Sequence, residues 1–295
     1  MRFIWIILVF FSACFINSCT KEIDFKLPAP DKSLVVNSLF HPDSIWQVSV
    51  SSLTQVEGYK YKSLYVENAT VELFENNNKI ETLIYTKKGN YISSNGTKPK
   101  HGYLYHIQVS SEDYPTAVSA QEMLPEVSNI ESLIIHDSID ASLYTNFYPD
   151  DLALFSEYAS SFTLAFTLQH EVSYHKVAAL SEYTEEVWAY AAITDLQYNI
   201  IPWLKEPLIK TDNQSNNHEL TFFITTQDPN TGEYFDPLDI VLFTYNESYY
   251  KYIESLYLQE RDMQNAFLSP TNLYSNIQYG QGIFSGYTTD EYKVN

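Results

Sequence analysis

The stretch Tyr103-Leu104-Tyr105-His106-Ile107-Gln108-Val109-Ser110 places a large apolar side chain at every second position. This period of two is typical of a β-strand that turns one face toward a core. Similar short segments lie on both sides of it, and turn-like runs such as Asn76-Asn77-Asn78 and Asn95-Gly96-Thr97 separate them. The segments are Leu34–Phe40, Trp46–Leu53, Ala69–Phe74, Ile80–Thr86, Asn90–Ser93, Tyr103–Ser110 and Thr116–Ala120. Seven short strands in about ninety residues predict an immunoglobulin-like β-sandwich over residues 34–122.

The run Met123-Leu124-Pro125-Glu126 interrupts the alternation and marks an expected domain boundary. Strand-like segments then resume and predict a larger β-rich domain over residues 128–295. These segments are Glu131–His136, Phe162–Gln169, Ser173–Leu180, Trp188–Thr194, Glu219–Thr226 and Ile240–Tyr245. Residues 138–160 and 197–218 have weak periodicity, so we expect loops or irregular insertions there.

One segment of the C-terminal domain has a helical period instead of a period of two. Residues 247–260 carry apolar side chains at helical spacing, and Thr244 or Asn246 stands where a cap is needed. The apolar positions are Tyr249, Tyr252, Ile253, Leu256 and Tyr257. The expected fold class is therefore all-β, with an N-terminal immunoglobulin-like β-sandwich followed by a larger β-rich domain that carries one amphipathic helix.

The N-terminus has the pattern of a bacterial lipoprotein signal. Met1-Arg2 is followed by an apolar run to Ile16, which is long enough for a signal peptide and too short to span a bilayer. The run ends at Ile16-Asn17-Ser18-Cys19, which resembles a lipobox. We expect residues 1–18 to be removed, Cys19 to carry acyl chains such as palmitate, and residues 19–33 to form an extended prolyl tether. An ordinary cleaved signal is the alternative.

Charge and cysteine content exclude several classes of function. The chain has 37 Asp and Glu against 17 Lys and Arg, a net charge of −20 that repels the phosphates of nucleic acids. Its two cysteines are Cys14, inside the apolar run, and Cys19. The expected mature chain therefore has no thiol for a disulfide, a zinc–thiolate site or a cysteine nucleophile.

No complete catalytic or metal-binding motif is present in the sequence. His170 and His175 are five residues apart, whereas a metalloprotease helix places its two histidines one turn apart. The run Gly280-Gln281-Gly282-Ile283-Phe284-Ser285-Gly286 lacks the following helix of a phosphate loop, so close backbone packing or turns explain its glycines better. Asp228-Pro229-Asn230-Thr231-Gly232 is interpreted as a turn, with a calcium loop as the alternative. We expect no cofactor, no metal and no enzymatic activity.

Tyrosine is frequent, with 25 residues, and several lie where strand propensity does not explain them. Tyr59, Tyr61 and Tyr65 lie in or near an expected loop, as do Tyr144 and Tyr148. A tyrosine offers a flat apolar face and a polar tip, which suits sugars, peptides or a partner protein. We therefore predict Tyr59, Tyr61 and Tyr65 as a candidate partner surface, with core or strand packing as the alternative.

Several motifs together resemble one family of Bacteroidetes outer-membrane lipoproteins, the domain-of-unknown-function 4249 family. They are the lipobox, the prolyl tether, Leu34-Val35-Val36, Asn68-Ala69-Thr70-Val71-Glu72-Leu73, His101-Gly102-Tyr103-Leu104-Tyr105 and the terminal Ser275-Asn276-Ile277 with Gly280-Gln281-Gly282-Ile283-Phe284. The resemblance covers nearly the whole mature chain. It implies an accessory lipoprotein that is encoded beside a TonB-dependent outer-membrane receptor, and it supplies no catalytic residues.

The resemblance and the N-terminus together predict where the protein acts. Lys21-Glu22-Ile23-Asp24, directly behind Cys19, resembles the acidic export signal of surface-exposed lipoproteins. We therefore expect a surface-anchored outer-membrane lipoprotein that acts as an accessory or binding partner of a TonB-dependent transporter. The alternatives are a structural or adhesive cell-surface protein and a surface hydrolase that acts on glycans.

Overall fold

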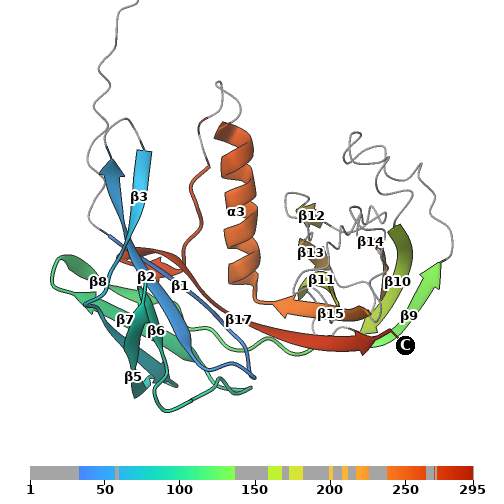
Figure 1. Cartoon of the computed structure of the whole chain (residues 1–295), viewed down its shortest axis with the longest axis horizontal. Helices are drawn as coiled ribbons and strands as arrows, with labels where there is room; N and C mark the ends of the chain where they lie inside the picture. Colours follow the sequence, from blue (N-terminus) through green and yellow to red (C-terminus); the bar gives the residue numbers. More distant parts are fainter. Residues whose placement is uncertain are drawn as a thin grey trace, which may run out of the picture.

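The computed structural model describes residues 33–56, 60–136, 159–167, 173–181, 199–201, 208–211, 217–225, 238–263, 269 and 271–294. Within these residues the chain forms the strands β1 to β17 and the helix α3, which confirms the all-β prediction. Figure 1 shows an N-terminal group of strands, a C-terminal group of strands and α3 between them.

Eight strands form the N-terminal part of the fold. They are β1 (Leu34–Phe40), β2 (Gln47–Val56), β3 (Lys60–Tyr65), β4 (Thr70–Glu75), β5 (Asn78–Lys87), β6 (Asn90–Ile92), β7 (Tyr105–Ser111) and β8 (Tyr114–Ser119). Hydrogen bonding follows the order β1-β2-β6-β5-β4-β7-β8, and β3 pairs with β2 off this path. β5 pairs with β4 through its first residues and with β6 through its last, so it passes from one layer to the other. The sequence predicts seven of these strands and misses β3.

The core of this part is apolar and rich in aromatic rings. Alternate residues of β7 from Tyr105 to Val109 are buried, as the alternation in the sequence predicts. The ring of Phe40 lies 4.9 Å from the ring of Trp46 and 4.9 Å from that of Phe284, measured between centroids. Phe284 belongs to a strand near the C-terminus, so segments far apart in the sequence complete one core.

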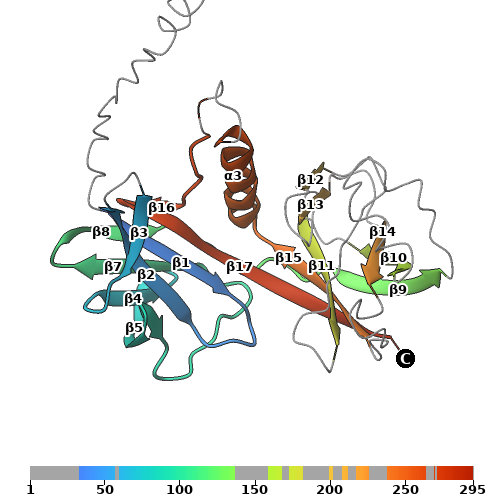
Figure 2. The same ribbon diagram turned by 45° about the horizontal axis from the view of Figure 1, so that its top comes forward.

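That strand, β17 (Gly280–Lys293), runs through both parts of the fold (Figures 1 and 2). Its residues 280–286 pair in parallel with β1, and its residues 287–293 pair antiparallel with β15 (Leu238–Tyr245). The short β16 (Ile277–Gln278) pairs with β8. Residues 277–286 fall in the expected C-terminal domain 128–295, yet they complete the N-terminal part. The expected boundary near residue 123 therefore does not separate two independent sets of strands.

Two glycines allow β17 to pass close to neighbouring segments of the chain. Gly282 has a φ of 115°, and a Cβ at this position would overlap the carbonyl oxygen of Val36. A Cβ at Gly286 would lie 2.7 Å from the carbonyl oxygen of Met123 and 2.8 Å from the ring of Phe40. These approaches confirm close backbone packing as the role of the glycines, in a strand that the sequence pattern does not predict.

The C-terminal part contains the rest of the main sheet and a smaller second sheet. The main sheet continues in the order β12-β13-β11-β15-β17, and the second has the order β14-β10-β9. Their strands are β9 (Asn129–His136), β10 (Ala159–Thr167), β11 (Ser173–Ser181), β12 (Asn199–Ile201), β13 (Leu208–Thr211) and β14 (Asn217–Thr225).

The predicted segments near β9, β10, β11, β14 and β15 are strands in the structure. The prediction of irregular structure over 197–218 is wrong at β12 and β13. These short strands are held by pairing, β13 with β11 and β12 with β13, and local periodicity does not reveal such pairing. The predicted strand Trp188–Thr194 and most of the expected loop 138–160 lie outside the described residues.

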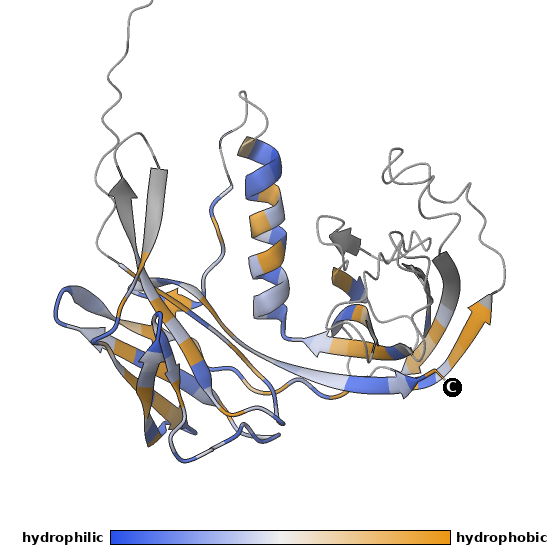
Figure 3. Ribbon diagram, in the orientation of Figure 1, coloured by the Kyte–Doolittle hydropathy of each residue, from blue (hydrophilic) through white to orange (hydrophobic). Residues whose placement is uncertain are grey.

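Helix α3 (Glu247–Met263) confirms the expected helix and extends it by three residues. Hydrophobic and hydrophilic residues are interleaved along it (Figure 3). Tyr250 and Ile253 are buried against Tyr174, Leu208 and Tyr245, whereas the expected apolar positions Tyr249, Tyr252 and Tyr257 are half-buried. The buried face is therefore rotated from the one that spacing alone indicates. The carbonyl oxygen of Asn246 accepts hydrogen bonds from the N–H groups of Tyr249 and Tyr250 and begins the helix.

Candidate functional site

The N-terminal part, α3 and β17 meet at a group of polar side chains, which we call the polar junction: Glu122, Asn246, Ser248, Asn276 and Ser285. The Glu122 carboxylate accepts hydrogen bonds from the side-chain amides of Asn246, at 2.9 Å, and Asn276, at 3.1 Å. Ser248 at the start of α3 donates to Ser285 of β17 at 3.0 Å. The two bonds to Glu122 connect residues that are 124 and 154 positions apart in the sequence, and the bond between Ser248 and Ser285 connects residues 37 positions apart.

Burial and hydrogen bonding act in opposite directions on Glu122. Burial is the larger influence and raises the pKa of the carboxyl, while the hydrogen bonds from Asn276 and Asn246 lower it. The net direction is upward. The carboxyl thus serves as a structural acceptor that is partly withdrawn from water.

The hydrogen bonds of Asn276 explain why the terminal motif has an asparagine at this position. Its side-chain amide donates to the carbonyl oxygen of Phe284 at 2.7 Å and accepts from the N–H of Phe284 at 2.9 Å. The side chain therefore satisfies both backbone groups of a residue whose ring is fully buried. The amide of Asn246 similarly donates to the carbonyl oxygen of Met123 at 2.7 Å.

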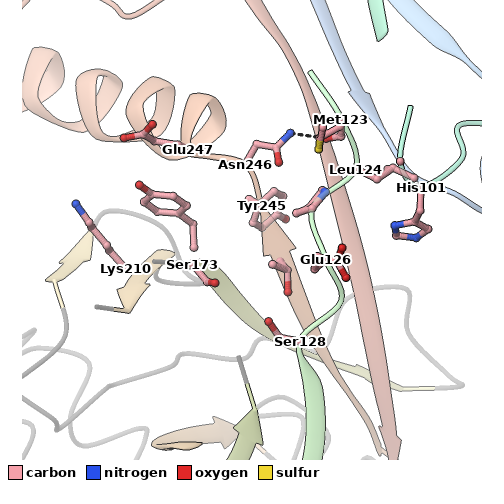
Figure 4. A pocket seen from close by; sticks show the side chains of 14 residues that line it. His101, Met123, Leu124, Glu126, Ser128, Ser173, Lys210, Tyr245, Asn246 and Glu247 are labelled. Atoms are coloured by element: carbon pink, nitrogen blue, oxygen red, sulfur yellow. Dashed lines mark hydrogen bonds between the residues drawn. The ribbon is translucent and has the colours of Figure 1, made fainter. Parts of the chain in front are cut away.

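A pocket of about 570 Å³, which we call the junction pocket, lies beside this network (Figure 4). Its walls come from the linker after β8, from β11 and β13, and from the end of β15 with the first residue of α3. The lining residues with polar or aromatic chemistry include His101, Glu126, Ser128, Ser173, Tyr174, Lys210, Tyr245, Asn246 and Glu247. Its volume is in the range that holds small molecules.

Tyr174 and its neighbours place aromatic, charged and hydrogen-bonding groups in the junction pocket. The ring of Tyr174 lies 4.8 Å from that of Tyr250, and the Lys210 ammonium lies 5.9 Å from the centroid of Tyr174. Burial, with the nearby carboxylate of Glu247, raises the pKa of the Tyr174 hydroxyl to about 12. The hydroxyl is therefore protonated at neutral pH and serves as a hydrogen-bond donor.

The two carboxylates of the junction pocket do not have the arrangement of a glycosidase. Glu247 lies at the start of α3 and Glu126 on the linker across the pocket (Figure 4). Both are exposed, and Glu247 pairs with Lys251 at 3.1 Å. A glycosidase keeps one carboxyl group desolvated so that it serves as the acid. The geometry is suited to holding a polar ligand by opposite charges.

Of the three residues of the predicted partner surface, Tyr65 is the one whose backbone and side chain the structure describes. Tyr65 is 56% exposed at the end of β3, beside Leu64, which is 44% exposed. Tyr61 belongs to β3, but its side chain is outside the described part, and Tyr59 lies outside the described residues altogether. Tyr61 and Tyr65, expected in or near a loop, belong to β3, which pairs with β2.

Most other positions singled out in the sequence lie outside the described residues. These are Cys19, His170, Tyr144, Tyr148 and the turn from Asp228 to Gly232. His175 is fully buried in β11, and its Nδ1 lies 3.4 Å from the hydroxyl of Thr244. Among the residues that the structure describes, no three or more His, Cys, Asp or Glu side chains gather as a metal site would need.

The described part of the chain contains no helix with the length and apolar character to span a membrane.

The polar junction and the junction pocket were not predicted from the sequence. Asn276 lies in the terminal motif and Glu122 directly before the break at Met123, and these are the two local signals that mark the junction.

Comparison with known proteins identifies the family of the chain. The model of a domain-of-unknown-function family, DUF4249, matches residues 20–293. The chain therefore belongs to the DUF4249 family, which confirms the resemblance seen in the sequence motifs. No curated protein matches the chain.

Proposed function

We propose that this member of the DUF4249 family is a lipid-anchored outer-membrane lipoprotein that binds a TonB-dependent receptor at the cell surface. The observation that carries the proposal is Ile16-Asn17-Ser18-Cys19, placed between a short apolar run and a prolyl segment. The match of the family model begins at residue 20, directly after the proposed lipidated cysteine.

The anchor limits how far the folded part lies from the membrane. The first strand of the structure begins at Leu34, so residues 20–33 lie between Cys19 and the fold. Fourteen residues reach at most about 50 Å when fully extended. A fold held within this distance has a high effective concentration toward neighbouring proteins of the same membrane, so a modest interface is sufficient.

The last residues of β3 support the choice of partner surface. Leu64 is 44% exposed and Tyr65 is 56% exposed there. Exposed apolar side chains favour burial against another protein. The two carboxylates of the junction pocket are both exposed, which favours a binding role over a hydrolytic one.

The anchor is tested by replacing Cys19 with Ala. The variant should lose labelling by a clickable fatty acid and leave the membrane pellet, because no other thiol remains in the expected mature chain. Protease added to intact cells should remove the wild-type protein, since the proposed location is the outer surface. Unchanged labelling of Cys19→Ala would contradict the lipoprotein proposal, and protection from protease in intact cells would place the protein in the periplasm.

The partner is tested by mild-detergent purification of the tagged wild-type protein from outer membranes. We expect one large β-barrel of the TonB-dependent class to co-purify, and we expect its yield to fall with Cys19→Ala because the tether is lost. Recovery of the lipoprotein without such a barrel would favour the structural or adhesive alternative.

A further inference from the structure

A second hollow, which we call the helix groove, lies between α3 and the outward face of β1, β2 and β17. It has a volume of about 500 Å³. Figures 1 and 2 both show α3 standing over β17 next to the N-terminal strands. One wall is aromatic, with Tyr249 and Tyr252 of α3 and Tyr287 of β17, and the other carries small polar side chains of β1 and β2.

The described lining of the helix groove carries no charged side chain. Its eleven described residues are serines, tyrosines, amides and aliphatic residues, although the whole chain has a net charge of −20. A charged ligand that entered this groove would lose hydration without gaining a partner of opposite charge. The groove is therefore suited to a neutral ligand, in contrast to the junction pocket with its lysine and two carboxylates.

The polar wall results from the alternation of β1 and β2. Asn37 lies opposite Ser49 in the β1–β2 pair and opposite Ile283 in the β1–β17 pair. These positions face away from the core that Val36 and Val50 fill. The side-chain oxygen of Asn37 accepts from the N–H of Ile283 at 3.2 Å, which fixes the orientation of its amide.

Ring contacts support two tyrosines of the aromatic wall. Tyr249 stacks on Tyr245 with centroids 4.5 Å apart, and Tyr287 lies 5.7 Å from Tyr245. The ring of His41 also packs against Tyr287, with centroids 4.8 Å apart. A ligand that stacks on these rings therefore does not have to order them first, which lowers the entropic cost of binding.

We propose that the helix groove binds a neutral saccharide of one or two sugar units. The flat faces of sugars carry C–H groups that stack on tyrosine rings, and their hydroxyls match the uncharged amides and hydroxyls of Asn37, Gln47 and Ser49. A purely apolar ligand would leave these polar side chains desolvated and unpaired. A folded protein partner does not enter a hollow of this volume.

The test uses the full lipidated protein in a detergent without a sugar head group. Binding is measured by calorimetry with maltose, cellobiose, lactose and diacetylchitobiose, and with glucuronate and glucosamine as charged probes. We expect at least one neutral disaccharide to bind saturably and both charged probes to show no binding. Absence of binding by all four neutral disaccharides, or equal binding of the charged probes, would overturn the proposal.

Variants locate the site. Tyr252→Ala should weaken binding about tenfold, the change that loss of one stacking contact produces, and Tyr252→Phe should retain it because the ring remains. Gln47→Ala changes an exposed side chain at the rim and should also weaken binding. Tyr279→Asn removes an exposed tyrosine outside the groove and is the matched control.

Circular dichroism establishes whether each variant is folded. If Tyr252→Ala does not fold, the binding affinity of Gln47→Ala tests the assignment of the site. Wild-type affinity in folded Tyr252→Ala or in Gln47→Ala would contradict the assignment. An equal loss of affinity in Tyr252→Phe or in Tyr279→Asn would also contradict it. Binding in this groove requires no receptor, so its failure leaves the receptor proposal unchanged.

Discussion

Replacing Asn276 by Ala tests whether the polar junction holds the two parts of the fold together. The variant removes the two hydrogen bonds to the backbone of Phe284 and the one to Glu122. Each buried backbone group left without a partner costs about 1–3 kcal/mol. Because Asn276 is itself only half-buried, water replaces part of this loss, and we expect about 3 kcal/mol in total.

This loss is measurable by thermal or guanidinium unfolding of the purified chain. For a protein of this size, about 3 kcal/mol lowers the melting temperature by roughly 6–12 °C. Fluorescence reports the transition, since Trp46 is buried in the core that Phe284 completes. The control is Asn272→Ala, an exposed asparagine of the same segment, which should leave the transition unchanged. Equal transitions for the two variants would refute the structural role of Asn276.

Two further substitutions test the packing of β17 and a buried carboxylate. Gly282→Ala should destabilise the fold by about 3 kcal/mol, because the added Cβ meets the backbone of Val36. The control Gly96→Ala, whose Cβ has nothing within 4 Å, should cost only about 1 kcal/mol. Equal midpoints of guanidinium unfolding for the two variants would contradict this prediction. Burial raises the pKa of Glu81, but hydrogen bonds from Thr97, Ser93, Asn95 and Ser94 more than offset it, so the pKa is lowered. The stabilisation that Glu81 provides is therefore present at neutral pH and lost as the pH falls through its folded pKa, so Glu81→Gln should lower the melting temperature at pH 7 and have little effect in acid. A difference that stays constant with pH would contradict this assignment.

Seven of the eight strands of the N-terminal part were predictable because their signal is local, and β3 was missed. Tyr105, Ile107 and Val109 alternate with polar residues, and this pattern alone indicates which face is buried. The helix was predictable for the same reason, although its buried face depends on Tyr174 and Leu208, which come from other strands.

The strand β17 was not predictable because its glycines lower strand propensity. Gly282 and Gly286 are required by the approach of Val36 and Met123, and this approach exists only in the folded chain. The junction pocket has the same origin, since its walls come from segments around residues 101, 124, 174, 210 and 246. Sequence reasoning identified the terminal motif but not the contacts that explain it.

Chemical crosslinking in living cells tests the proposed receptor association most directly. The account predicts that the tagged wild-type protein is crosslinked to one dominant β-barrel of the TonB-dependent class. The yield should fall when Tyr59, Tyr61 and Tyr65 are replaced together by Ala. It should not fall with Tyr279→Asn, which removes a tyrosine that is 75% exposed elsewhere and tolerates the φ of 57° at that position. Recovery of the tagged protein alone, without a crosslinked barrel, would contradict the account.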